Sequence, residues 1–165
     1  MKHVKKSVLL WYSAREMYEL VVGVEAYPQF LPWCDSATVL ERHDADPQAG
    51  TPAGMTARLG LHYAGVRQSF TTRNEDVPGE SVRLTLVDGP FSKLDGTWQF
   101  KPLKPVDPSA PPGPDEPVAC RVEFDLAYAF SNRVLEAVLS PVFDQVANTF
   151  VDSFVKRAAQ VYGER

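Results

Sequence analysis

Cysteine and histidine, the residues that build most metal sites and nucleophilic sites, are scarce in this sequence. Two cysteines, Cys34 and Cys120, and three histidines, His3, His43 and His62, are scattered over 165 residues. None has the close spacing of metal ligands and no Ser-His-Asp site is visible, so the sequence predicts no metal centre and no catalytic triad. In a reducing compartment both cysteines are expected to be free thiols. Cys34 is interpreted as an inert buried residue in preference to a reactive thiol.

The sequence also lacks an excess of basic residues, glycine-rich phosphate loops and long apolar runs. The net charge of −4 argues against DNA or other nucleic acid as a partner bound through bulk charge. The apolar run over 8–11 is too short for a signal-peptide core or a membrane span. These absences predict a cytoplasmic protein, with transient peripheral contact at the inner membrane left open as an alternative.

The length of the chain suits one domain with a sizeable core and is too short for two. A single domain over 1–165 is therefore predicted. Six of the fourteen prolines lie between 105 and 117, which predicts an extended loop insertion. A domain boundary there is the competing interpretation. It is disfavoured because the strand that follows needs the preceding strands to bury its apolar face.

Alternating apolar and polar residues are the dominant pattern from Met55 onward. This period of two is typical of strands with one buried face, and the turn-rich joints at 63–65 and 77–80 indicate hairpins. The sequence therefore predicts an antiparallel sheet with one face toward a core and one toward water. The predicted strands are 3–11, 35–43, 55–63, 66–72, 82–86, 98–100 and 120–130.

A long amphipathic helix is predicted at the carboxy terminus, because apolar residues recur every three or four positions over 135–154. Ser140 is a good N-cap before Pro141, so the helix is expected to restart or kink there. From there to Tyr162 it would run roughly 30 Å. A Ser-x-x-Glu capping box predicts a further short helix over 13–22.

The predicted inward face carries no His, Asp, Glu, Lys or Arg. Its most polar members are Tyr63, Gln68, Thr72, Cys120 and Tyr128. Acid–base catalysis needs titratable groups that desolvation can tune, so the pattern predicts a protein that is not an enzyme. Tyr63 and Tyr128 are candidates to bond a ligand, with bonding to a backbone carbonyl as the alternative.

Four arginines, Arg58, Arg67, Arg73 and Arg83, fall on the outward faces of three successive predicted strands, and the sequence predicts no acidic residue among them. Two interpretations stay open for this set, which we call the arginine face. It is either a solvated surface that discourages edge aggregation or a surface that binds the phosphates of RNA or lipid.

The stretch YPQFLPWC, residues 27–34, combines aromatic residues with two prolines that exclude a regular helix. It either fills the core or forms the lip of a pocket for an apolar ligand. Pro32 and Trp33 are predicted to form the lip. The residues predicted to anchor the segment in the core are Tyr27, Phe30 and Leu31.

Five stretches carry a family resemblance. They are YPQFLPWC, FTTRN at 70–74, LVDGPFSKLDGTWQF at 86–100, CRVEFDLAYAFSN at 120–132 and FVKRAAQVYG at 154–163. In this order they resemble the coenzyme Q-binding, START-like family of the polyketide cyclase/dehydrase type, most closely its RatA-like branch of ribosome association toxins. The resemblance implies an α+β helix-grip fold, also called Bet v 1-like, in which six to seven antiparallel strands wrap around a long carboxy-terminal helix.

The resemblance further implies a cavity between sheet and helix that binds ubiquinone or a related isoprenoid lipid without catalysis, supporting respiratory quinone function. No other cofactor is expected. The branch implies binding to the large ribosomal subunit and blocking of subunit association, and the family name also includes polyketide or oligoketide cyclases. The predicted lining residues, each with ordinary core packing as the alternative, are Pro32, Trp33, Tyr63, Phe70, Phe91, Trp98, Tyr128, Val146 and Phe150.

Overall fold

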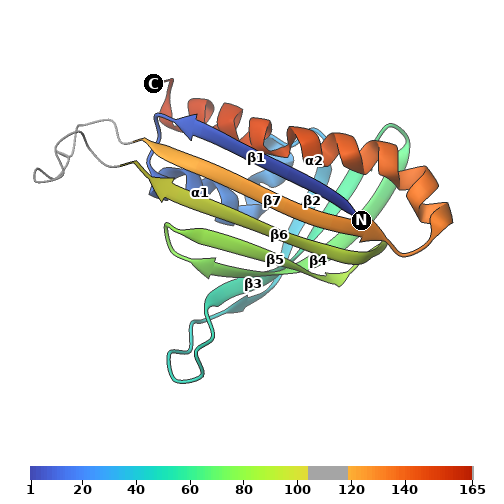
Figure 1. Ribbon diagram of the computed structural model, residues 1–165, viewed down its shortest axis with the longest axis horizontal. Helices are drawn as coiled ribbons and strands as arrows, with labels where there is room; N and C mark the ends of the chain where they lie inside the picture. The colour runs from blue at the N-terminus through green and yellow to red at the C-terminus, as the bar shows by residue number, and fades with distance from the viewer. Residues whose placement is uncertain (104–118, 165) are drawn as a thin grey trace, which may run out of the picture.

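The computed structural model describes residues 1–103 and 119–164. The Pro-rich loop predicted at 105–117 lies outside these ranges and stays a prediction. The described residues form a seven-stranded antiparallel sheet in the order β1-β7-β6-β5-β4-β3-β2, with a long carboxy-terminal helix (Figure 1). The elements are β1 (Lys2–Leu10), α1 (Ala14–Val22), the 3-10 helix η1 (Val24–Gln29), β2 (Cys34–His43), β3 (Ala53–Tyr63), β4 (Val66–Val77), β5 (Ser81–Asp88), β6 (Phe91–Pro102), β7 (Cys120–Phe130) and α2 (Arg133–Tyr162).

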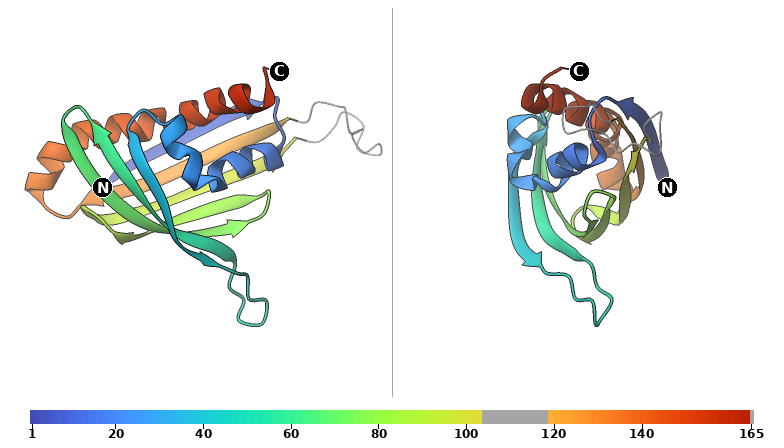
Figure 2. Two further views of the ribbon diagram at one scale, coloured as in Figure 1. Left: turned by 180° about the vertical axis from the view of Figure 1, so that it is seen from behind. Right: turned by 90° about the vertical axis from the view of Figure 1, so that its left-hand side faces the viewer.

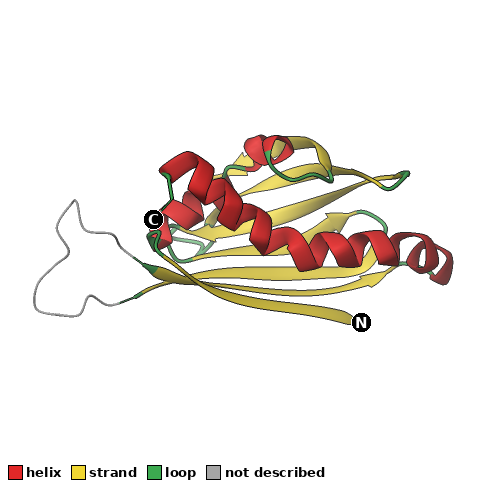
Figure 3. Cartoon of the chain, turned by 90° about the horizontal axis from the view of Figure 1, so that it is seen from above, coloured by secondary structure: helices red, strands yellow, loops and turns green. Residues whose placement is uncertain are grey.

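The sheet curls around α2, and α1 and η1 lie on its concave side (Figure 2). Seen from above, α2 runs along the length of the sheet (Figure 3). This arrangement confirms the predicted α+β class, the strand count and the helix-grip architecture. The concave side is where the apolar residues of every strand gather, so any internal site must lie between this face and α2.

Strand β7 shows most directly how the sequence pattern becomes the buried face. Its apolar residues from Cys120 to Tyr128 are buried at every second position, while Arg121 and Asp125 between them are exposed. The strand pairs with β1 on one side and β6 on the other, which places it inside the sheet. Alternation in the sequence was therefore sufficient to orient this strand.

Helix α1 begins at the predicted capping box. The Ser13 hydroxyl accepts a hydrogen bond from the Glu16 amide at 3.0 Å, and the Glu16 carboxylate accepts one from the Ser13 amide at 2.9 Å. The helix ends before Gly23, and η1 follows. The chain then reaches Trp33 through a turn, because Pro28 and Pro32 prevent a longer regular helix.

Helix α2 differs from its prediction at the amino end. It is capped by Asn132, whose side chain accepts from the Leu135 amide at 2.9 Å, and it continues through Pro141 over 30 residues. Ser140 is thus an interior residue and not a cap. Proline is tolerated here because Pro141 and Ala137, whose carbonyl loses its intrahelical partner, are both exposed to water.

Strand β4 is longer than predicted. It runs to Val77, pairing with β3 through Asp76 and Ala53 and with β5 through Asp76 and Val82. Continued alternation places Asn74 and Asp76 on the concave side, beyond Thr72. The prediction that no acidic residue faces inward is therefore wrong. The polar composition of residues 73–77 did not predict a strand, but pairing with β3 on one side and β5 on the other extends β4 to Val77.

Candidate ligand-binding cavity

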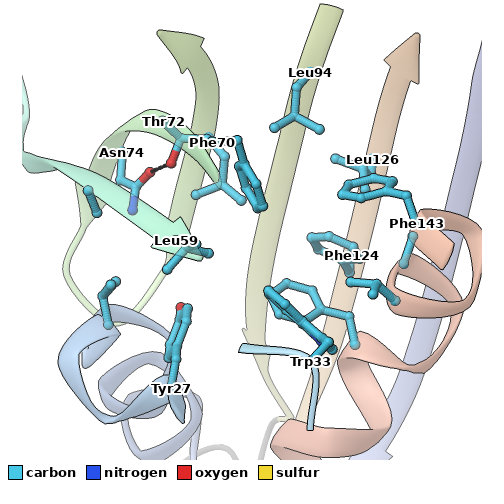
Figure 4. A pocket seen from close by; sticks show the side chains of 16 residues that line it. Tyr27, Trp33, Leu59, Phe70, Thr72, Asn74, Leu94, Phe124, Leu126 and Phe143 are labelled. Atoms are coloured by element: carbon cyan, nitrogen blue, oxygen red, sulfur yellow. Dashed lines mark hydrogen bonds between the residues drawn. The ribbon is translucent and has the colours of Figure 1, made fainter. Parts of the chain in front are cut away.

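An apolar cavity of about 60 Å³ lies between the concave face of the sheet, η1 and α2 (Figure 4). Five strands, the segment after η1 and the middle of α2 contribute its walls. The lining residues are Val24, Tyr27, Trp33, Ala57, Leu59, Phe70, Thr72, Asn74, Leu84, Leu94, Phe124, Leu126, Phe143, Val146, Ala147 and Phe150. A cavity with this lining would bind a ligand mainly by burying the ligand's apolar surface, since the lining offers few hydrogen-bonding groups.

Two polar side chains interrupt the apolar wall. The Thr72 hydroxyl donates to the Asn74 side-chain oxygen at 2.8 Å, and both residues are buried. The pair lies on β4, at a side of the cavity away from Trp33 (Figure 4). Neither group titrates near neutral pH, so the lining itself offers hydrogen bonds but no acid or base.

Four of the predicted lining residues border this cavity: Trp33, Phe70, Val146 and Phe150. The prediction omitted the remaining apolar walls, although their signals were in the sequence. Phe124 and Leu126 alternate along β7, and Phe143 stands seven positions before Phe150 on the same stripe of α2. What the pattern did not reveal is which part of the buried face borders free space.

Trp98 and Phe91 face inward, as alternation predicts, but they pack against other rings. The Trp98 ring lies 4.6 Å from that of Phe124 and 5.2 Å from that of Phe154, with 1% of its surface exposed. Phe91 lies 4.8 Å from Phe143 and borders only a void of about 10 Å³. Both are core residues, because the buried face of the sheet extends beyond the part that borders the cavity.

Tyr128 also faces inward without lining the cavity. Its hydroxyl donates to Asp144 of α2 at 2.5 Å, and the same carboxylate binds Lys2 of β1 at 2.5 Å. Although partial burial acts to raise the pKa of Asp144, the hydrogen bonds from Lys2 and Tyr128 hold it below its ordinary value. This cluster attaches α2 to two neighbouring strands. The Tyr128 hydroxyl thus has a structural partner outside the cavity lining, and its ligand-binding role stays a prediction.

Pro32 and Tyr63 border a second, outer pocket of about 270 Å³. Tyr63 is the last residue of β3 and is 40% exposed. It nevertheless borders this pocket together with residues of α2, so it faces the side of the sheet that α2 covers, as alternation predicts. The residues lining the outer pocket are Pro32, Trp33, Tyr63, Gln145, Val146, Thr149, Asp152, Ser153 and Lys156.

The buried carboxyl of Asp76 lies outside both pockets. Only 9% of the residue is exposed, and its Oδ1 atom has no hydrogen-bond partner. Burial raises the pKa of Asp76 to about 6. Burial, and secondarily the charge of Asp76, also raise the pKa of Tyr18 on α1. A buried carboxyl that titrates near neutrality is a possible acid or base, so an enzymatic role stays open.

Both cysteines are buried free thiols, as expected. Burial raises the pKa of Cys34 and of Cys120 to about 11. The thiolate is the reactive form, so at neutral pH neither residue is an activated nucleophile. Within 1–103 and 119–164, no three His, Cys, Asp or Glu side chains come close enough together to hold a metal ion.

All four residues of the arginine face are exposed, on β3, β4 and β5. The face is not purely basic. Glu75, which the longer β4 places opposite Arg83, shares it, and the Arg83 guanidinium donates to Asp95 of β6 at 3.3 Å. The prediction of no acidic neighbours is thus wrong, which reduces the positive potential available to an anionic partner. Among the helices described, none is both long and apolar enough to cross a bilayer.

The fold and the apolar cavity under α2 are consistent with the family to which the sequence is matched. The model of the family "Polyketide cyclase / dehydrase and lipid transport" matches residues 10–155. This chain belongs to that family.

Curated relatives within the family carry two kinds of names. The chain is 40% identical over 161 residues to the ribosome association toxin RatA of Pseudomonas aeruginosa, covering 98% of each protein. It is 26% identical over 162 residues to the mitochondrial coenzyme Q-binding protein COQ10 homolog B of Xenopus laevis, covering 97% of this chain and 59% of that protein. Both groups were expected from the sequence motifs.

Solved structures confirm the START-like fold. A START superfamily protein from Mycobacterium smegmatis superposes with a TM-score of 0.70 at 22% identity, covering 96% of this chain and 98% of that one. The Zhui aromatase/cyclase from Streptomyces superposes with a TM-score of 0.69 at 15% identity, with 99% of both chains covered. At these identities the likeness establishes the fold and leaves the chemistry to be argued from this chain.

Proposed function

We propose that this protein binds a hydrophobic small molecule, coenzyme Q or a related isoprenoid lipid, between the sheet and α2, without transforming it. The observation that carries the proposal is the apolar cavity in the core, whose lining has few polar groups: the Thr72–Asn74 pair, the Trp33 indole N–H and the Tyr27 hydroxyl. The lipid-transport branch of the family description and the coenzyme Q-binding relative support the same class of ligand.

The cavity must widen for such a ligand. Pockets for drug-sized molecules measure about 300–1,000 Å³, whereas this one measures about 60 Å³. The flanking rings of Trp33 and Phe150 lie 6.1 Å apart in a tilted contact. Displacement of the Trp33 ring is the simplest route to a larger space, because Trp33 borders both this cavity and the outer pocket. Burial of an isoprenoid chain at about 25 cal/mol per Å² offsets the cost.

Purified protein is expected to bind a short-chain quinone such as decylubiquinone with micromolar affinity, and Ala147→Leu is expected to weaken binding at least tenfold. Ala147 is 2% exposed and lines the cavity, so a larger side chain occupies the ligand's space. Isothermal titration calorimetry measures the affinity, and mass spectrometry of extracted lipid identifies the native ligand.

The matched control is Ala137→Leu, since Ala137 is an exposed position on the same helix, outside the cavity lining. It is expected to bind like the wild type. The carrier proposal fails if the wild type neither co-purifies with a lipid nor binds added quinone. Equal losses in both variants would locate the ligand elsewhere.

Ribosome association is the second candidate, favoured by the full-length similarity to RatA. In this proposal the arginine face meets the phosphates of rRNA in the large subunit, with affinity falling as salt rises. Cosedimentation with large subunits at several salt concentrations tests it. Arg58→Glu with Arg73→Glu should abolish binding, while Lys93→Glu, an exposed charge reversal on β6, should not. Absence of wild-type binding at low salt would contradict this candidate.

A further inference from the structure

The inner cavity and the outer pocket are separated by very little protein. Among their lining residues they share Trp33 and Val146 and no others. The indole of Trp33 is the larger of the two side chains and is 4% exposed. The wall between the two spaces is therefore about one side chain thick, and movement of this ring would join them.

The backbone of Trp33 is held by hydrogen bonds on both sides of the residue. Its carbonyl accepts from the His62 amide at 2.8 Å, and the next residue, Cys34, donates to the Leu31 carbonyl at 3.0 Å. The indole contacts the ring of Phe150 in a tilted arrangement, with 6.1 Å between the two ring centroids. Motion at this position therefore falls on the side chain and not on the main chain.

The indole N–H of Trp33 is a buried donor without an acceptor. Buried tryptophans usually place this group against a partner, because an unpaired buried donor destabilises the fold. The side chains of the two pockets differ in character. The inner lining is almost wholly apolar, whereas the outer pocket presents Gln145, Thr149, Asp152, Ser153 and Lys156 from one face of α2. An unpaired donor thus stands at the boundary between an apolar and a polar space.

We propose that Trp33 is the head-group residue of the binding site and separates a head subsite from a tail subsite. The ligand is an uncharged amphipathic molecule with a carbonyl-bearing head. Its head occupies the outer pocket, its carbonyl oxygen accepts a hydrogen bond from the Trp33 N–H, and its apolar chain enters the cavity past the displaced ring. An uncharged head fits because Asp152 and Lys156 contribute both signs of charge to the pocket.

This inference rests on the proposed function and adds a direction of binding and a requirement for an acceptor atom. It distinguishes two ligands of equal apolar length. A quinone offers carbonyl acceptors and a plain alkylbenzene does not. If Trp33 were only a core residue, removing its N–H would affect both ligands equally.

The first test compares decylubiquinone and decylbenzene by titration calorimetry on the full-length wild type, Trp33→Phe and Trp11→Phe. Trp33→Phe keeps an aromatic ring and is expected to weaken quinone binding about tenfold while changing the alkylbenzene affinity less than about twofold. Trp11→Phe, on the exposed surface, is expected to change neither. Equal loss for both ligands, or no loss for either, would overturn the assignment of Trp33.

The indole N–H resonances give an independent readout. The chain has three tryptophans, and Trp33→Phe identifies the signal of Trp33 by its disappearance. Quinone is expected to shift that signal downfield as a hydrogen bond forms. A signal that stays in place under saturating quinone would overturn the hydrogen bond. Absence of any ligand binding to the wild type would instead defeat the proposed function itself.

The head subsite has its own test. Thr149→Phe fills the outer pocket from a half-buried position and is expected to weaken decylubiquinone binding at least tenfold. Its neighbour Asn148 is exposed and lines neither pocket, so Asn148→Phe is the matched control and is expected to bind normally. Wild-type affinity in Thr149→Phe would place the head elsewhere and contradict the proposed orientation.

Discussion

Phe154→Ala is expected to lower the free energy of unfolding by about 4 kcal/mol, the largest effect of any single truncation proposed for this protein. Phe154 is fully buried at 0% exposure. Its ring lies 5.4 Å from Tyr27, 5.1 Å from Phe30 and 5.2 Å from Trp98. It therefore joins α2, the YPQFLPWC segment and the sheet in one cluster, and its loss leaves a cavity between three elements.

Urea denaturation followed by circular dichroism measures this loss. The matched control is Phe130→Ala, because Phe130 is only half-buried, at the end of β7. Its truncation is expected to cost about 1–2 kcal/mol. Similar costs for the two variants would show that Phe154 does not hold the three elements together.

Asp76→Asn is expected to stabilise the protein by about 2 kcal/mol at pH 7.5 and to leave its stability near pH 4 almost unchanged. Burial raises the pKa of Asp76 to about 6 from an ordinary 3.8. The folded state therefore holds the proton more tightly than the unfolded chain. Wild-type stability should fall as pH rises from about 4 to about 6, and above that the cost of the buried charge is fully present.

Thermal denaturation over pH 4–8 tests the prediction on Asp76. The matched control is Asp88→Asn, since Asp88 is exposed at the end of β5 and carries no comparable cost. The variant Asp76→Asn should show a flatter pH profile than the wild type and the control. An unchanged profile would mean that the carboxyl is not held in an unfavourable environment. A stabilised variant would show that the carboxyl is retained at a cost, as at many functional sites.

Sequence patterns recovered most of the architecture because the relevant forces act locally along the chain. Alternation oriented β7, and the Ser-x-x-Glu pattern located the start of α1 at Ser13. The same reasoning failed where packing overrides a local signal. Ser140 and Pro141 have the character of a helix start, yet Asn132 caps α2 and an exposed position accommodates the proline.

The sequence analysis did not predict the inward-facing Asp76 on β4, and here too packing overrides a local signal. Asn74 and Asp76 are poor strand residues by composition, so the strand was predicted to end at Thr72. Pairing with β3 and β5 carries it to Val77 and buries both side chains. Sheet neighbours distant in sequence therefore decided the chemistry of the concave face, and no local pattern contained that information.

The YPQFLPWC segment shows most clearly which features the sequence determines and which depend on the tertiary structure. By itself the sequence determined that this apolar stretch is not a regular helix and that it lies against the core, because proline geometry and hydrophobicity are local properties. Only the tertiary structure decided that Trp33 stands between two spaces with an unpaired N–H. Free volume and unmet hydrogen bonds depend on how side chains from β3, α2 and this segment fit together, and that fit exists only in the folded protein.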